Sequence, residues 1–223
     1  MQRRNLVVAI DGPSGSGKST VARGVAEALG LRYLDTGAMY RAVTWLALER
    51  GVALDAPELL GALAEEAKLD IVDDPRRPAI SIEAIDVTDA VRGAAVTAAV
   101  SAVSAVPAVR AAMVARQRGV IGEGGIVVEG RDIGTTVAPD AAVKVFLIAD
   151  PSARAVRRAL QDGAGERAVA STEADLARRD AADSTRVASP LTQAADAVVL
   201  DSTHIDAATA IARVVDLAEA VSA

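Results

Sequence analysis

The 223-residue chain contains no cysteine and only one histidine, His204. Without cysteine, neither a disulfide bond nor a thiolate-bound metal can form. A single histidine excludes a metal site built from several imidazoles, and it leaves little room for a catalytic Ser-His-Asp triad. The lack of disulfides agrees with a reducing compartment, so we expect a cytoplasmic protein.

Aromatic residues are also scarce, at 2% of the chain, although hydrophobic residues make up 51%. The core must therefore be built mainly from alanine, valine, leucine and isoleucine. Such residues suit helices packed on a parallel sheet. The length indicates one large domain or slightly more.

Positive charge is in short supply, because the formal net charge is −6 and only Lys18, Lys68 and Lys144 are lysines. A protein that binds a nucleic-acid polymer usually has a basic balance, so we expect no such partner. The remaining basic residues are arginines, whose planar guanidinium suits bidentate phosphate contacts. We expect about half of them to form a solvated surface and the others to bind small anions.

Long hydrophobic runs are missing as well. The longest uncharged stretch, residues 93–109, is weakly apolar and is interrupted by Thr97, Ser101, Ser104 and Pro107. A membrane-spanning helix needs about 20 strongly apolar residues, so we expect no membrane segment but a buried helix that breaks at Pro107. The apolar part of residues 1–11 is too short for a signal peptide.

Short apolar runs alternate with helical patterns along the rest of the chain. This alternation predicts an α/β fold, a Rossmann-like parallel sheet with helices on both faces. Strands are expected near residues 6–10, 31–34, 125–130, 143–150 and 195–202. Helices are expected near residues 18–29, 38–50, 57–67, 90–117, 153–161 and from 206 onward.

Two segments depart from this alternation. Residues 69–72, 79–82 and 85–87 read as short strands, and the turn sequence DDPRRP separates the first two. They predict a small antiparallel insert. Residues 162–172 read as a polar loop, and the Thr172–Asp175 spacing places the next helix start at Thr172.

The sequence IDGPSGSGKST contains the phosphate-binding pattern G-x-x-x-x-G-K-[ST], with Gly12, Gly17, Lys18 and Ser19 at its fixed positions. Glycines let backbone N–H groups surround an anion, and the following helix adds the partial positive charge of its N-terminus. Lys18 can reach the β- and γ-phosphates of ATP, and the Ser19 hydroxyl can bind Mg²⁺. We predict that the whole loop binds ATP: Gly12, Pro13, Ser14, Gly15, Ser16, Gly17, Lys18, Ser19 and Thr20.

Such a loop serves many functions. A guanine-reading N-K-x-D motif, expected in a regulatory GTPase, does not occur in the sequence. A small-molecule kinase needs a second anion site beside the loop. A nucleotide-dependent regulator needs none, and this alternative stays open at this point.

Two further motifs supply arginines for a second site. DTGAMYR carries Arg41, and EGRDIGT carries Arg131 and Asp132. Each motif follows a predicted strand, at the edge where open α/β sheets bind their ligands. The alternative for Arg41 is a simple ion pair with Glu129 or Asp35.

Taken together, the segments IDGPSGSGKST, LDTGAMYRA, VRAAMVARQR, VVEGRDIGTTVAPDA, KVFLIAD and VLDST resemble the bacterial cytidylate kinases over essentially the whole chain. The resemblance implies a P-loop kinase fold that transfers the ATP γ-phosphate to CMP or dCMP with Mg²⁺. It implies a core at residues 1–37, 121–152 and 186–223. It also implies an acceptor-binding region with the antiparallel insert at 38–120, a lid at 153–185, and a monomer.

The resemblance also implies roles for individual residues. Lys18, Arg131 and the lid residues Arg157 and Arg158 are the expected catalytic residues. The acceptor phosphate is expected to be held by Arg41, Arg131 and Arg186. The cytosine is expected to be read by Ser101, Arg110 and Asp132, and the sugar to be contacted by Asp183 and Arg179. Thr36 supplies a hydroxyl at a position where serine is common in the family.

The cytosine-reading group makes chemical sense, because a carboxylate such as Asp132 accepts from the cytosine amino group. Uracil would place a carbonyl there, so we expect UMP to be disfavoured. Other acceptors, such as AMP, UMP or shikimate, remain alternatives, and Ser101 by itself would read as a small core residue. Glu129 departs from the aspartate usual in the family, which puts in doubt how it orients Arg131 or a metal-bound water.

Overall fold

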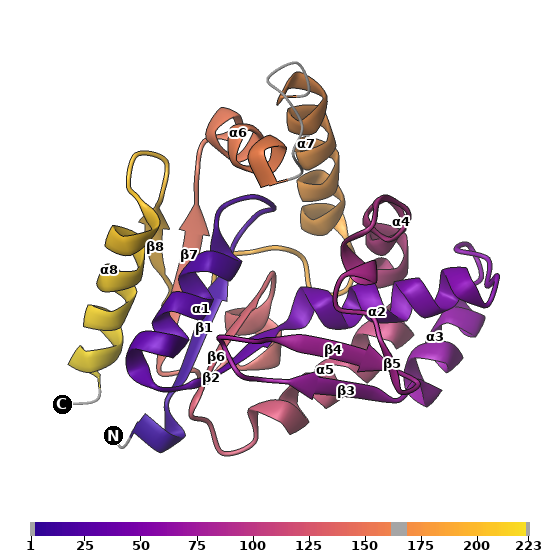
Figure 1. Cartoon of the computed structure of the whole chain (residues 1–223), viewed down its shortest axis with the longest axis horizontal. Helices are drawn as coiled ribbons and strands as arrows, with labels where there is room; N and C mark the ends of the chain where they lie inside the picture. Colours follow the sequence, from indigo (N-terminus) through magenta and orange to yellow (C-terminus); the bar gives the residue numbers. More distant parts are fainter. Residues whose placement is uncertain (1–2, 162–168, 222–223) are drawn as a thin grey trace.

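A computed structural model describes residues 3–161 and 169–221 of the chain (Figure 1). Its main sheet has five parallel strands in the order β2-β6-β1-β7-β8. The predicted α/β fold is therefore confirmed. The strands are β1 (Val7–Asp11), β2 (Arg32–Asp35), β6 (Ile126–Gly130), β7 (Val143–Ile148) and β8 (Val198–Asp201).

Alternate residues of the central strands enter two separate hydrophobic cores. Val8 and Ile10 of β1 pack with helices α1 (Lys18–Leu29) and α8 (Ala207–Ala220), whereas Ala9 belongs to the core on the opposite face. This burial on both faces explains why the strands read as unbroken apolar runs. Figure 1 shows α1 and α8 together beside the sheet.

The strand register brings three functional segments to one edge of the sheet. Asp11 at the end of β1 lies opposite Gly130 of β6, and Asp35 at the end of β2 lies opposite Glu129. The residues that follow these strands therefore emerge side by side.

The core on the face of the sheet that Ala9 enters also contains residues of α2 (Thr36–Glu49), α3 (Pro57–Glu66) and the insert. The insert is confirmed as a three-stranded antiparallel sheet in which Leu69 pairs with Ile82. Its strands are β3 (Leu69–Val72), β4 (Ala79–Ile82) and β5 (Ile85–Asp86).

The uncharged stretch begins with the helix α4 (Ala94–Ala105), which follows a short turn, η2 (Ala90–Arg92). Pro107 begins the next helix, α5 (Pro107–Ile121), so the predicted break is confirmed. Within the described residues, no single helix is long and apolar enough to cross a membrane. Among these described residues, the pair α4 and α5 has the length and composition of a membrane span, but the two helices meet at a bend of 96°.

Several helix starts differ from the prediction by a few residues. Helix α2 begins at Thr36 rather than residue 38, because the Asp35 carboxylate caps it by accepting from the Ala38 amide at 2.9 Å. Helix α7 (Val169–Thr185) begins three residues before the predicted start at Thr172. Residues 169–172 of the predicted polar loop are thus helical, and 162–168 lie outside the described residues. Helix α6 (Pro151–Gln161) precedes them.

Two arginines near the end of α5 contact neighbouring backbone, although Arg116 is only half-buried and Arg118 is exposed. The Arg116 guanidinium donates to the carbonyls of Glu65 and Ala67, which end α3. Arg118 donates to the carbonyls of Thr136 and Val137. Both arginines therefore tie α5 to neighbouring backbone, where carbonyl groups at helix ends lack partners.

Candidate functional site

The candidate donor site is the loop between β1 and α1. Gly12 has φ +149°, and a Cβ at this position would lie 2.1 Å from the Leu147 carbonyl oxygen. Gly17 precedes α1 with φ +91°. Both positions therefore require glycine, one for space and both for backbone conformation. The loop has the strand–turn–helix context that phosphate binding needs.

Lys18 is buried under this loop, with 6% of its surface exposed, and its Nζ donates to the Pro13 carbonyl at 2.7 Å. Burial and the nearby Arg131 guanidinium lower the pKa of Lys18. A phosphate beside the Nζ would stabilise its charged form, because an opposite charge favours ionisation.

The Ser19 hydroxyl donates to Glu129 Oε2 at 3.0 Å, and the Tyr33 hydroxyl donates to Oε1 of the same carboxylate. Glu129 and Tyr33 are both buried. Burial raises the pKa of Glu129, and the nearby Asp35 adds to this effect. Glu129, which stands where the family usually has aspartate, thus accepts a hydrogen bond from the candidate metal ligand Ser19 and a second one from Tyr33.

A cavity of about 180 Å³ lies beside the donor loop, and Lys18 and Ser19 form part of its wall. Residues from α2, α4, α5, α7 and the turn after β6 complete the wall. All nine predicted acceptor-binding residues line this cavity: Thr36, Arg41, Ser101, Arg110, Arg131, Asp132, Arg179, Asp183 and Arg186. The fold therefore brings together residues that lie up to 150 positions apart in sequence, from Thr36 to Arg186.

At one end of this cavity, Arg110 Nη2 lies 2.5 Å from Asp132 Oδ2. Arg110 also donates to the Ser104 carbonyl at 3.2 Å, and its guanidinium carbon lies 5.2 Å from the centre of the Tyr40 ring. Arg186 approaches the other oxygen of Asp132 at 3.4 Å. This end offers a buried carboxylate held by two cations, which is an arrangement that can accept from an amino group.

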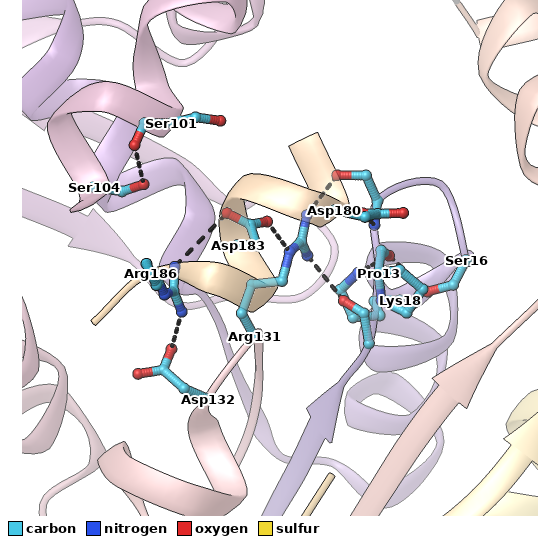
Figure 2. A network of polar contacts seen from close by, with 12 residues as sticks. Pro13, Ser16, Lys18, Ser101, Ser104, Arg131, Asp132, Asp180, Asp183 and Arg186 are labelled. Atoms are coloured by element: carbon cyan, nitrogen blue, oxygen red, sulfur yellow. Dashed lines mark hydrogen bonds and ion pairs between the residues drawn. The ribbon is translucent and has the colours of Figure 1, made fainter. Parts of the chain in front are cut away.

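At the other end, Arg131 connects the cavity to the donor loop (Figure 2). Its Nε donates to Asp183 at 2.8 Å, while its other nitrogens donate to the Gly12 carbonyl at 3.1 Å and the Ser14 hydroxyl at 2.6 Å. The guanidinium thus lies between the donor loop and α7.

Arg41 does not form the ion pair considered as the alternative. It donates to the Val91 carbonyl at 3.2 Å and to the Thr97 hydroxyl at 2.9 Å. Asp35 instead lies 3.6 Å from Arg92. Burial and neighbouring arginines, first Arg179, lower the pKa of Arg41 to about 10, so the side chain stays charged at neutral pH.

Thr36 of α2 and Ser101 of α4 both line the cavity. The Thr36 hydroxyl donates to the Glu129 carbonyl at 2.7 Å, so it also links α2 to β6. Ser101 is half-buried, and its carbonyl accepts from the Ser104 hydroxyl at 3.3 Å.

The predicted lid arginines, Arg157 and Arg158, both line a cavity along the donor loop but differ in their other surroundings. Arg157 donates to the hydroxyl of Ser202 at 3.0 Å and to its carbonyl. Arg158 lines both this cavity and a larger one of about 1250 Å³ along the donor loop. The larger cavity has Gly15 to Val21 in one wall and Ser202 to Asp206 near another. Its size can accommodate a nucleotide beside the loop.

Comparison with known proteins identifies the family of this chain. The sequence profile of the family described as "Cytidylate kinase" matches residues 8–220. The chain belongs to this family. A cytidylate kinase of Streptomyces griseus is 48% identical over 219 residues, covering 97% of this chain and 94% of that protein. One from Nocardia farcinica is 50% identical, covering 90% of this chain and 88% of that one.

Solved structures support the fold of this cytidylate kinase family member. A gluconokinase from Sinorhizobium meliloti matches with a TM-score of 0.50 at 16% identity, over 99% of this chain and 95% of that one. At this identity the likeness concerns the fold alone.

The chemistry of the site fits a magnesium ion held largely by phosphates. Among the described residues, no group of three or more histidine, aspartate or glutamate side chains is arranged to hold a metal. The Ser19 hydroxyl and the adjacent Glu129 carboxylate are oxygen donors of the kind that Mg²⁺ prefers.

Sequence reasoning missed several residues that shape the site. Asp11, at the end of β1, accepts from the Ile133 and Gly134 amides, both at 2.8 Å. It thereby fixes the turn η3 (Ile133–Val137) that follows Asp132. A buried aspartate directly before a glycine-rich loop was the available signal. Burial raises the pKa of Asp11 to about 6, despite these two amide donors.

Two other missed residues are Arg154 and Asp180, which contact the donor loop from α6 and α7. Arg154 is one of three arginines in the helix predicted near residues 153–161, and Asp180 lies in a charged segment without a pattern. Neither position carries a signal that a single sequence could separate from a surface charge.

Proposed function

We propose that the chain transfers the γ-phosphate of ATP to CMP or dCMP, giving ADP and CDP or dCDP. The observation that carries this proposal is the shared cavity. Nine predicted acceptor-binding residues line one small space that the donor-loop residues Lys18 and Ser19 also line.

On the donor side, we assign residues 12–20 to the ATP phosphates, with Lys18 on the β- and γ-phosphates. Mg²⁺ would be held by the Ser19 hydroxyl and, directly or through water, by Glu129, and would neutralise charge on the phosphates. Arg157 and Arg158 of the lid complete this set beside the larger cavity.

On the acceptor side, Arg41, Arg131 and Arg186 align the CMP phosphate. Phosphoryl transfer passes through a loose transition state, so alignment and charge neutralisation supply most of the catalysis. The attacking group is already an anionic phosphate oxygen, so no general base is needed. Arg131 can serve both substrates, because it already contacts the donor loop through Gly12 and Ser14.

The base is read by Asp132, Arg110 and Ser101, and the sugar by Asp183 and Arg179. Arg110 and Arg186 hold Asp132 from two sides, so its remaining lone pairs have a fixed direction. A cytosine amino group can donate to them. The uracil carbonyl would face the same carboxylate and lose this bond.

We further propose that residues 38–120 and 153–185 close over the substrates and exclude water, which would otherwise hydrolyse ATP. We also propose that the chain acts as a monomer. A single-species mass of one chain in analytical ultracentrifugation is the expected result.

An acceptor panel tests the proposed function. ADP formation from ATP and Mg²⁺ is measured with CMP, dCMP, UMP, AMP, shikimate or no acceptor, and then with Asp132→Asn. We expect high turnover with CMP and dCMP, and a loss of the preference over UMP in the variant. High turnover with another acceptor would overturn the base-reading roles, and acceptor-independent hydrolysis alone would favour a nucleotide-dependent regulator.

A further inference from the structure

Both polar groups of the Ser14 main chain are held from the lid side. The Ser14 amide donates to Asp180 Oδ1 at 2.9 Å, and the Ser14 carbonyl accepts from Arg154 Nη1 at 3.0 Å. Arg154 and Asp180 also pair directly through Nη1 and Oδ2. Ser14, Arg154 and Asp180 thus form a closed triangle between the donor loop, α6 and α7.

The triangle is shielded from solvent. Ser14 is 5% exposed, and the side chains of Arg154 and Asp180 are 10% and 17% exposed. Charged hydrogen bonds in such surroundings are stronger than at a surface. By contrast, Asp175 on the same helix pairs with Arg178 at the surface, where the two side chains are 60% and 72% exposed, respectively.

The next residue of the loop also lies against the lid. Gly15 has φ +76°, and a Cβ there would come within 3.2 Å of Arg154. Leu176 of α7 lies just beyond, at 3.5 Å from the same point. The conformation of the loop apex therefore depends on the position of α6 and α7.

Helix α7 reaches the same loop residue by a second route. Asp183, one turn after Asp180, holds Arg131, which donates to the Ser14 hydroxyl (Figure 2). Arg131 belongs to the acceptor cavity, whereas Arg154 does not line it. The Asp180 route thus reaches Ser14 without passing through Arg131, and Ser14 itself also lines the acceptor cavity.

We propose that Asp180 and Arg154 are positioning residues for the donor phosphates. They hold Ser14 and Gly15 in the conformation that receives ATP and so link the lid helices to the phosphate-binding loop. A loop that is already ordered loses less conformational entropy on binding, which strengthens nucleotide affinity. This inference rests on the proposed function and extends it to two residues outside the predicted site.

The test compares Asp180→Ala, Arg154→Ala and the double variant with Asp175→Ala as the matched control on α7. KM is measured for ATP and for CMP, the Kd of ADP by calorimetry, and Tm by thermal unfolding. We expect Asp180→Ala to raise the KM of ATP and the Kd of ADP about tenfold, with the KM of CMP changed less than about twofold. The double variant should bind ADP no more weakly than the single variant with the lower ADP affinity, because Asp180 and Arg154 act as one unit.

Asp180→Asn serves as the conservative variant, because its amide oxygen still accepts from Ser14 while the charge opposite Arg154 is lost. It should retain part of the ADP affinity, and it replaces Asp180→Ala if that variant does not fold. A lowered Tm with unchanged Kd of ADP would overturn the proposal, since Asp180 would then only join α6 to α7. Equal changes for ATP and CMP would overturn it as well. Wild-type inactivity toward CMP would instead reject the proposed function, and the Kd of ADP would still decide the role of Asp180.

Discussion

The donor loop and the acceptor cavity are built on different principles. The loop is one continuous segment, residues 12–20, and it presents backbone N–H groups whose arrangement depends on glycines such as Gly12 and Gly17. The acceptor cavity is lined by side chains that come from several helices and one turn. A backbone-built site depends on local conformation, whereas a side-chain-built site depends on the packing of distant elements. Single substitutions should therefore separate the two functions.

The largest effect is expected at Lys18, the one charged side chain of the donor loop. Lys18→Ala removes the cation that faces the β- and γ-phosphates, and we expect kcat to fall by about a thousandfold or more with every acceptor. Steady-state kinetics with CMP and dCMP measure this change. The exposed Lys68→Ala is the control, and a loss confined to one acceptor would contradict a donor-side role.

The next effect tests the acceptor side. Arg41→Ala should lower kcat/KM for CMP by about a hundredfold, because one phosphate ligand is lost while the donor loop is not touched. The Kd of ADP, measured by calorimetry, should stay within about twofold. Arg50→Ala, at the exposed end of the same helix, should change neither quantity. A parallel loss of ADP affinity would break the proposed separation.

A smaller effect is expected where the two regions meet, at Glu129. Glu129→Asp shortens the side chain, so the carboxylate loses its contact with Ser19, Tyr33 or both. Affinity for Mn²⁺ in the presence of ADP, followed by electron paramagnetic resonance, should weaken about tenfold. Glu58→Asp on the surface of α3 is the control. Unchanged Mn²⁺ affinity would remove Glu129 from the metal site.

The smallest change in turnover is expected at Asp11, whose effect concerns stability. Its pKa is raised to about 6 in the folded protein, from 3.8, mainly by burial. Folding is therefore favoured by protonation: the contribution is complete below pH 4 and is lost as the pH rises through 6. The stability difference between wild type and Asp11→Asn should decrease by about 2 kcal/mol between pH 4 and pH 7. Urea unfolding at several pH values measures it, and a difference independent of pH would contradict the raised pKa.

The predictability of the two regions differs for the same reason as their construction. The donor loop is readable because its pattern, strand and helix are contiguous, and helix α1 was predicted at residues 18–29, where it lies. The parallel sheet and the insert followed from apolar periodicity. Helix starts were less accurate, since the Asp35 cap and the start of α7 depend on local contacts.

Arg41, Arg131 and Asp132 could be proposed from motifs that follow predicted strands, whereas the other acceptor residues were available only through the resemblance to a family. Nothing in the order of residues says that Ser101, Arg110 and Asp132 line one cavity, because the packing of α4 and α5 decides it. Asp11, Arg154 and Asp180 escaped for a related reason. Each acts through a backbone amide or carbonyl of a distant segment, and such partners leave no mark in the sequence.

The central claim is that the terminal phosphate of ATP goes to a cytidine monophosphate. The most direct test incubates the protein with γ-³²P-labelled ATP, Mg²⁺ and CMP, and separates the products by chromatography. With the wild type, the label is expected in CDP, with little of it released as free phosphate. With Lys18→Ala, no label is expected in CDP. Label recovered only as inorganic phosphate, at the same rate with and without CMP, would contradict this claim.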